Sequence, residues 1–314
     1  MRPLHVVRIA DLAPLPEERR WLVDQLWSES AVGIVGGEPK CCKSFLALDL
    51  AVSVASGSPA LRRFPVTRPG PVLLFAAEDA LHVVRERVSG IAAASGVPLA
   101  HLDLHVITAP ILRLDLKDDA ARLNDTVAAL SPRLLVLDPF VRLHRIDENA
   151  SSDVAPLLAS LRGLQRTHGC SVLLVHHARK GGAASRPGQA LRGSSELHAW
   201  GDSNLYLRRT ADKLTLAVEH RAAPSIPELS LHLRAAHDAL ALEIAAPSPP
   251  ALPPSPPPAL EDRVRDLLTQ AHAPLPHAAL RQACGVRAAV LSGILADMQR
   301  RGVIAREPRG YSLA

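Results

Sequence analysis

A glycine-containing turn between an apolar run and a helical pattern constrains this chain more than any other feature. Residues 31–36 (AVGIVG) are typical of a buried strand, and residues 45–56 carry apolar side chains at helical spacing until Gly57 can end the helix. The turn between them, residues 37–44, reads GEPKCCKS. Backbone N–H groups at the start of a helix bind anions. The segment therefore predicts a phosphate-binding loop.

The last two residues of this turn are expected to bind the phosphates and the metal ion. In the pattern G-x-x-x-x-G-K-[ST], the lysine neutralises the β- and γ-phosphates of ATP and the hydroxyl binds Mg²⁺. Lys43 and Ser44 take these places. The other expected nucleotide contacts are Gly37, Glu38, Pro39, Lys40, Cys41, Cys42 and Phe45.

The loop departs from the pattern at Cys42, which stands where the second glycine belongs. Two interpretations are open. If the position needs a left-handed backbone, a cysteine costs on the order of 1–2 kcal/mol. If it needs only a small side chain near the phosphates, a cysteine serves.

Cys41 and Cys42 would lie at a helix N-terminus beside Lys40 and Lys43. That setting lowers thiol pKa values, so a redox switch on nucleotide binding is one hypothesis; two small, tolerated side chains are the other. The remaining cysteines do not suggest a disulfide framework, since Cys170 lies in an apolar stretch like a core residue.

We expect a cytoplasmic protein with no membrane partner. No apolar run approaches the roughly 20 residues that span a bilayer. Residues 1–11 lack the apolar segment of a secretory signal.

Further apolar runs at residues 71–77, 133–137 and 170–175 predict an α/β fold with a mostly parallel central sheet. They are apolar throughout, as strands buried on both faces are, and a helical pattern at residues 152–167 separates the last two. Residues 214–218 and 229–233 are expected to be later strands, antiparallel at an edge.

Acidic residues follow two of these strands. The carboxyl ends of parallel strands face a ligand crevice. Glu78 is the candidate base that orients the attacking water, with Asp79 as the alternate or as the cap of a helix at residues 81–90. Asp138 ends another strand and is the second candidate magnesium ligand.

His176 and His177 end a fourth strand. An imidazole there can contact the γ-phosphate, and we expect His176 to be this sensor, with the other ring packed below it. A zinc site is the alternative, although no cysteine or acid accompanies the pair at ligand spacing.

Taken together, GEPKxxKS, Glu78-Asp79, VLDP, LVHHARK and RGSS resemble the RepA-like branch of the RecA-fold ATPases over roughly residues 15–235. The resemblance implies ATP and Mg²⁺ as ligands, a homo-oligomer such as a hexamer, and DNA as partner. It implies Lys43 and Ser44 as the Walker A pair, Glu78 as the catalytic glutamate, Asp138 as the Walker B aspartate and the histidine pair as sensors. The family's arginine finger follows RGSS, but Asp202 lies about there. Arg192, Arg208, Arg209 and Arg221 are the substitutes.

The proline-rich run at residues 247–258 divides the chain, because it favours extended polyproline II structure. We expect an N-terminal lead segment (1–29) packing on the core, a RecA-like domain (30–245), a linker (246–259) and a winged-helix-like α+β domain (260–314). In the last, helices are expected at residues 260–272, 277–284 and 287–301, followed by short strands at residues 303–306 and 311–313.

The net charge of +5 permits contacts to nucleic-acid phosphates without requiring them. Expected DNA contacts are Arg287 at the third helix of the small domain, Arg309 at its wing and Arg192 in a basic, glycine-rich stretch. The leading functional hypothesis is an ATPase acting on DNA, such as a helicase or replication factor. The alternatives are a DNA-binding regulator switched by nucleotide with little or no turnover, and a scaffold that does not bind nucleotide.

Overall fold

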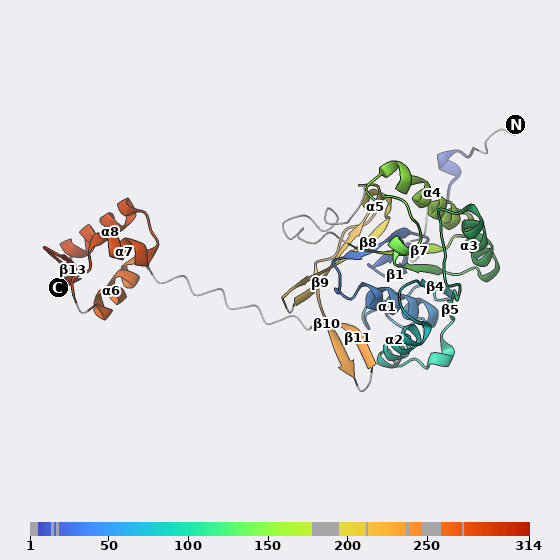
Figure 1. The fold of residues 1–314 in the computed structure, drawn as a ribbon, viewed down its shortest axis with the longest axis horizontal. Coiled ribbons are helices and arrows are strands. Elements are labelled where there is room, and N and C mark those ends of the chain that lie inside the picture. Colours follow the sequence, from blue (N-terminus) through green and yellow to red (C-terminus); the bar gives the residue numbers. More distant parts are fainter. Residues whose placement is uncertain are drawn as a thin grey trace. The chain divides into compact units, whose positions relative to one another are not determined.

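The computed structural model describes residues 6–13, 16, 19–177, 195–211, 213–236, 239–245, 259–271 and 273–314 (Figure 1). The chain divides into two compact units, residues 1–246 and residues 247–314. The proline-rich run and the basic stretch with Arg192 lie outside the described residues.

A nine-stranded sheet forms the centre of the first unit, in the order β11-β10-β9-β8-β3-β7-β6-β4-β5. The six strands from β8 to β5 run parallel, and β9, β10 and β11 continue the sheet as antiparallel strands. This confirms the α/β fold class and the antiparallel edge. The strands are β3 (Val32–Gly37), β4 (Val72–Ala76), β5 (Leu104–Val106), β6 (Leu134–Asp138), β7 (Ser171–His177), β8 (Ser203–Thr210), β9 (Lys213–His220), β10 (Leu229–Ala236) and β11 (Ala239–Ile244).

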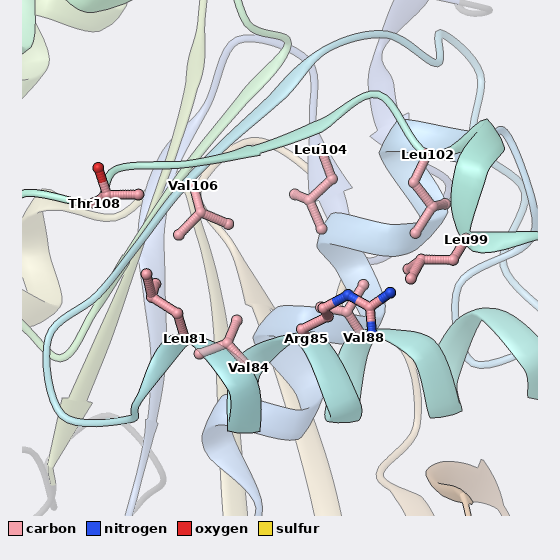
Figure 2. A pocket seen from close by; sticks show the side chains of 9 residues that line it. All are labelled: Leu81, Val84, Arg85, Val88, Leu99, Leu102, Leu104, Val106 and Thr108. Atoms are coloured by element: carbon pink, nitrogen blue, oxygen red, sulfur yellow. The ribbon is translucent and has the colours of Figure 1, made fainter.

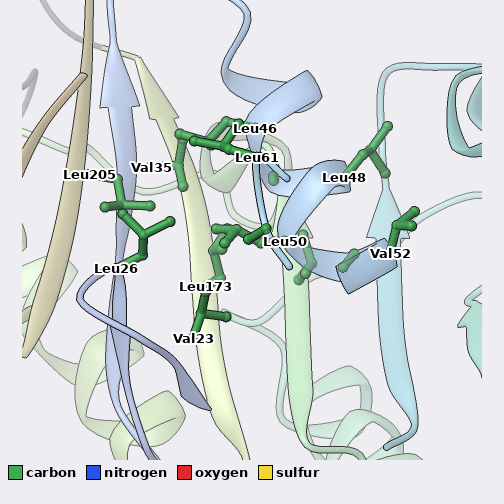
Figure 3. Close-up of a cluster of buried hydrophobic side chains, with 14 of the residues drawn as sticks. Val23, Leu26, Val35, Leu46, Leu48, Leu50, Val52, Leu61, Leu173 and Leu205 are labelled. Atoms are coloured by element: carbon green, nitrogen blue, oxygen red, sulfur yellow. The ribbon is translucent and has the colours of Figure 1, made fainter. Parts of the chain in front are cut away.

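Helices cover both faces of this sheet, as the fully apolar strands require. On one face α1 (Lys43–Ser56) and α2 (Leu81–Ala94) contribute to a core that includes Leu46, Leu173 and Leu205 (Figure 3). On the other, α3 (Lys117–Leu130), α4 (Ser151–His168) and α5 (Ser195–Trp200) pack against a second core with Ile34 and Leu174. Successive residues of one strand therefore enter different cores.

The N-terminal segment contributes a short hairpin, β1 (Trp21–Val23) and β2 (Trp27–Ser28), whose Leu22 and Trp27 are buried in the first core. The 3-10 turn η1 (Ile9–Asp11) precedes the hairpin along the chain, and none of its three residues is buried.

Several elements were not predicted, and each carries a weak pattern. Helix α3 buries only Leu123 and Val127, so its apolar stripe is narrow. Strand β5 has three residues, none of them fully buried. Strand β8 ends in exposed arginine and threonine residues.

The second unit has its own core. Helices α6 (Leu260–Gln270), α7 (His277–Cys284) and α8 (Ala288–Arg300) precede a hairpin of β12 (Ile304–Glu307) and β13 (Gly310–Leu313). These elements match the three expected helices and two strands. Leu280, Leu291, Leu295 and Met298 are buried among them.

Among the described helices, none alone has the length and apolarity to cross a membrane, although the bent pair α7 and α8 together passes that test of length and composition.

Candidate nucleotide site

Many of the predicted site residues meet at the carboxyl ends of the parallel strands, although Gly37, Glu38, Pro39, Cys41 and His176 do not line the cavity there. A cavity of about 280 Å³ opens there between the loop after β3, the ends of β4, β6 and β7, and helix α2. Its lining contains Lys40, Cys42, Lys43, Ser44, Phe45, Glu78, Arg87, Asp138, Val175 and His177.

The loop of residues 37–44 lies on one side of the cavity. Its backbone conformation suits Gly37 but is unfavourable for Cys42. Gly37 has φ +155°, and a Cβ there would lie 2.3 Å from the carbonyl oxygen of Leu207 and 2.7 Å from Cys41 Sγ. Only glycine fits this position. Cys42 is the N-cap of α1 with φ 65° and ψ 27°. The position therefore has a left-handed backbone, so the first interpretation is right and the cysteine costs on the order of 1–2 kcal/mol.

Lys43 lies inside this loop. Its Nζ donates a hydrogen bond to the carbonyl oxygen of Glu38 at 2.7 Å and lies 3.9 Å from Cys41 Sγ. Burial lowers the pKa of Lys43, while Cys41 and Asp138 act to raise it. The loop thus encloses a buried cation that an anionic ligand would stabilise.

Asp138 faces the same cavity from the end of β6. Burial raises its pKa to about 6; the hydrogen bond with Ser44 and the charge of Lys43 oppose this rise, and Glu78 and Asp79 add to it. A divalent cation at this point would satisfy the buried carboxylate and the neighbouring hydroxyl. Both are the hard oxygen ligands that Mg²⁺ takes, together with waters and phosphate oxygens.

Glu78 and Asp79 follow β4, and each pairs with an arginine. Glu78 Oε1 accepts a hydrogen bond from Arg142 Nε at 2.8 Å. Asp79 forms an ion pair with Arg87, whose guanidinium lies over the Phe45 ring. Asp79 does not cap α2, because the N-cap is Ala80 and no side chain caps the helix. Arg87 and Arg142 were not predicted from the sequence.

The histidine pair divides between the two faces of the sheet. His177 lies opposite Gly37 in the register of β3 and β7 and lines the cavity. His176 is 1% exposed, and its ring lies 6.1 Å from that of Phe140 in the second core. The histidine in the cavity is therefore His177, not His176. Strand alternation explains the difference, because Leu173 and Val175, on the α1 face, are four and two residues before His177.

A family model described as "AAA domain" matches residues 1–183 of this chain. The chain belongs to this AAA domain family. A solved structure whose title describes it as an "ATPase Domain" is similar to it with a TM-score of 0.53 and 12% identity, covering 68% of this chain and 86% of that chain. At this identity the likeness shows the fold, a RecA-like P-loop ATPase fold. Family and fold together support a nucleotide-binding ATPase.

Of the two hypotheses for Cys41 and Cys42, the surroundings of Cys41 do not favour the redox switch. Burial raises the pKa of Cys41, outweighing the opposite effect of Lys43, so this thiol is not activated. Cys42 Sγ accepts a hydrogen bond from Arg209 Nη2 at 3.3 Å. All four cysteines are free, and Cys170 is buried, as expected of a core residue.

The arginine substitutes for a finger have different surroundings. Arg209 reaches the loop of residues 37–44 in the same chain, through a hydrogen bond to Cys42. Arg221 donates to the carbonyl oxygen of Ala199 and pairs with Asp202. Asp202 also pairs with Arg162 and accepts a hydrogen bond from the backbone N–H of Val32 at 3.2 Å, so it holds strand ends together. Arg192 lies outside the described residues.

A second cavity of about 300 Å³ shares no lining residue with the nucleotide cavity. Figure 2 shows the residues that line it. It is mostly apolar and lies between α2, the turn η3 (Leu99–His101) and the edge strand β5.

In the part of the chain that the structure describes, no group of three or more His, Cys, Asp or Glu side chains is placed to hold a metal ion. The zinc alternative for the histidine pair therefore has no support there.

Proposed function

We propose that this AAA domain binds ATP with Mg²⁺ and hydrolyses it. One observation carries the proposal: the cavity gathers Lys43, Ser44, Asp138, Glu78 and His177 from four separated segments of the chain. A fold alone would not require a cation, two carboxylates, a hydroxyl and an imidazole to share one cavity.

Each residue has a role in this proposal. Lys43 and the loop N–H groups stabilise negative charge on the phosphates, and Ser44 and Asp138 hold the metal. Bound Mg²⁺ would neutralise charge on the β- and γ-phosphate oxygens. Glu78 accepts a hydrogen bond from the attacking water and orients it. His177 takes the sensor role first assigned to His176.

ATP turnover with variants tests this proposal. Lys43→Ala is expected to lose both binding and turnover, because the buried cation is gone. Glu78→Gln is expected to bind ATP and to turn it over at least about 100-fold more slowly. Arg85→Ala, on the same helix as Arg87 but outside this cavity, is the control. Turnover of Glu78→Gln at the wild-type rate would refute the assignment of the base.

We further propose that the second unit is a winged helix that binds DNA, which makes the protein an ATPase acting on DNA. Three helices and a hairpin support this interpretation, with Arg287 at the N-cap of α8 and Arg309 between β12 and β13. Both arginines are exposed. Helicase activity, a role in replication and a homo-oligomer such as a hexamer belong to the same proposal, as does a cytoplasmic location.

Two measurements test the DNA proposal. The first is the rate of ATP turnover with and without single- and double-stranded DNA, and the second is the affinity of the protein for duplex DNA. Arg287→Ala and Arg309→Ala are expected to weaken duplex binding and to reduce its salt dependence. Arg265→Ala, on α6 and paired with Glu261, is the control. The oligomeric state follows from sedimentation with and without nucleotide.

A nucleotide-switched regulator with little turnover is the second candidate. The hydrogen bond from Arg142 to Glu78 favours it, since it occupies an oxygen of the candidate base. Saturable ATP binding with no measurable hydrolysis, with or without DNA, would decide for the regulator.

A further inference from the structure

A cluster of one carboxylate and three imidazoles lies at the end of β7, next to the nucleotide cavity. Its members are His144 and Glu148, from the segment after β6, and the pair His176 and His177. The hydrolysis proposed above uses only His177.

The segment after β6 packs against the end of β7 through aromatic and imidazole rings. The ring of Phe140 lies 4.4 Å from that of His144 and 6.1 Å from that of His176. His144 Nε2 lies 3.4 Å from Glu148 Oε1, with side chains 2% and 16% exposed. This acid–imidazole pair is therefore held in the protein interior, where charge interactions are stronger than in water.

The charges in the cluster are complementary. Burial acts to raise the pKa of Glu148, but the imidazole of His144, 3.4 Å away, and the charge interactions with His176, His144 and His177 outweigh it and lower the pKa. Burial lowers the pKa of His177, and the charges of Lys43 and His176 lower it further; the carboxylates of Glu78 and Glu148 oppose this shift.

We propose that Glu148 is a positioning residue: with His144 it orients the end of β7 so that His177 is presented to the cavity as a hydrogen-bond donor. The proposal rests on the proposed hydrolysis for its catalytic consequence. The placement of the ring by Glu148 does not depend on turnover. The segment after β6 reaches the end of β7 through the rings of His144 and Phe140, and it reaches the glutamate side of the cavity through Arg142.

The substitution Glu148→Gln tests this, because glutamine keeps the size of the side chain and removes its charge. We expect kcat for ATP to fall about tenfold with KM nearly unchanged, and the pH profile of kcat to shift to lower pH. Glu148→Asp, which restores the charge, is expected to recover part of the loss. A purely structural role would lower stability without moving the pH profile.

The matched control is Asp147→Asn, which removes the neighbouring carboxylate. Asp147 is exposed, and its Oδ1 accepts a hydrogen bond from the backbone N–H of Asn149 at 2.9 Å. This variant is expected to retain the wild-type kcat and pH profile.

Ring signals of the histidines, measured by NMR in the nucleotide-free protein, provide a readout independent of turnover. We expect the His177 signals to move in Glu148→Gln and to stay in place in Asp147→Asn. Unmoved His177 signals, or a Glu148→Gln variant with wild-type kcat and pH profile, would overturn the proposal. If the wild-type protein proves not to hydrolyse ATP, the proposed function fails, whereas the NMR comparison still decides the role of Glu148. Thermal melting of each variant identifies any that does not fold. If Glu148→Gln does not fold, Glu148→Asp takes its place in the NMR comparison as a change of side-chain length: the shorter side chain is expected to move the His177 signals, and unmoved signals would again overturn the proposal.

Discussion

Cys42 has a backbone conformation that is unfavourable for cysteine, while its side chain makes contacts at the candidate site. Its left-handed backbone suits glycine, yet its side chain lines the cavity and its sulfur accepts a hydrogen bond from Arg209. The loop therefore has a thiol beside the phosphate site at a cost in backbone energy.

Replacing Cys42 by glycine is expected to stabilise the protein by up to about 1 kcal/mol, because relief of the left-handed strain exceeds the added entropy of the unfolded chain. Urea unfolding measures the effect. Cys41→Gly is the control and is expected to destabilise, since Cys41 is fully buried and has no positive φ. Equal losses in both variants would contradict the strain argument.

Asp138 gives the site a dependence on pH. With its pKa raised to about 6, the carboxyl binds a proton below that pH, and a protonated carboxyl is a poor magnesium ligand. Affinity for Mg²⁺–ATP is therefore expected to rise as pH increases through about 6, and Asp138→Asn is expected to lose this dependence. Titration calorimetry between pH 5 and 8 measures it. Because the unfolded carboxyl ionises at lower pH than the folded one, this group also lowers stability as pH rises from about 4 to 6.

At the scale of elements, a buried ion pair joins α1 to the segment that follows it. Asp49 is 1% exposed, accepts a hydrogen bond from the backbone N–H of Leu61 at 2.7 Å and lies 2.8 Å from Arg62 Nη2. Arg62 also donates to the carbonyl oxygen of Leu242 in β11. Leu61 and Arg62 both have positive φ, so this contact holds a strained turn between α1 and the sheet edge.

Arg62→Ala is expected to destabilise the first unit by about 3 kcal/mol, because it leaves Asp49 buried without its partner. Arg63→Ala is the matched control: that side chain is exposed and lies over the Phe64 ring, so its loss is expected to cost less than about 1 kcal/mol. Chemical denaturation compares the two. A double variant, Asp49→Leu with Arg62→Leu, is expected to recover most of the loss if the unpaired charge is its cause.

At the scale of the molecule, two units with separate cores share one chain. The first two cores belong to residues before 246 and the third to residues after 259. The described residues that line the nucleotide cavity all belong to the first unit. The two proposed activities should therefore separate.

A chain ending at residue 246 is expected to retain ATP binding at wild-type affinity and to lose most of its affinity for duplex DNA. Fluorescent-nucleotide titration and duplex binding at two salt concentrations measure the two effects. Duplex affinity that survives this truncation would move the DNA contact to the first unit.

The sequence by itself determined the fold class and several of the residues that line the candidate cavity. Long apolar strands, helical spacing and glycine turns act locally, so β3, α1, β4, β6 and β7 were expected within a few residues of their bounds, together with Lys43, Ser44, Glu78 and Asp138. Helix α3 and strand β5 were not predicted from the sequence, because their apolar patterns are weak.

Only the tertiary structure decided which side chains face the cavity and which residues they contact there. Alternation puts His176 and His177 on opposite faces of β7, but the face that α1 covers is fixed by packing across the sheet. Arg87 and Arg142 likewise reach the site because the segments between strands fold toward it, and no local sequence pattern predicts these contacts. The sequence specifies the strand ends, and long-range packing selects the residues that complete the site.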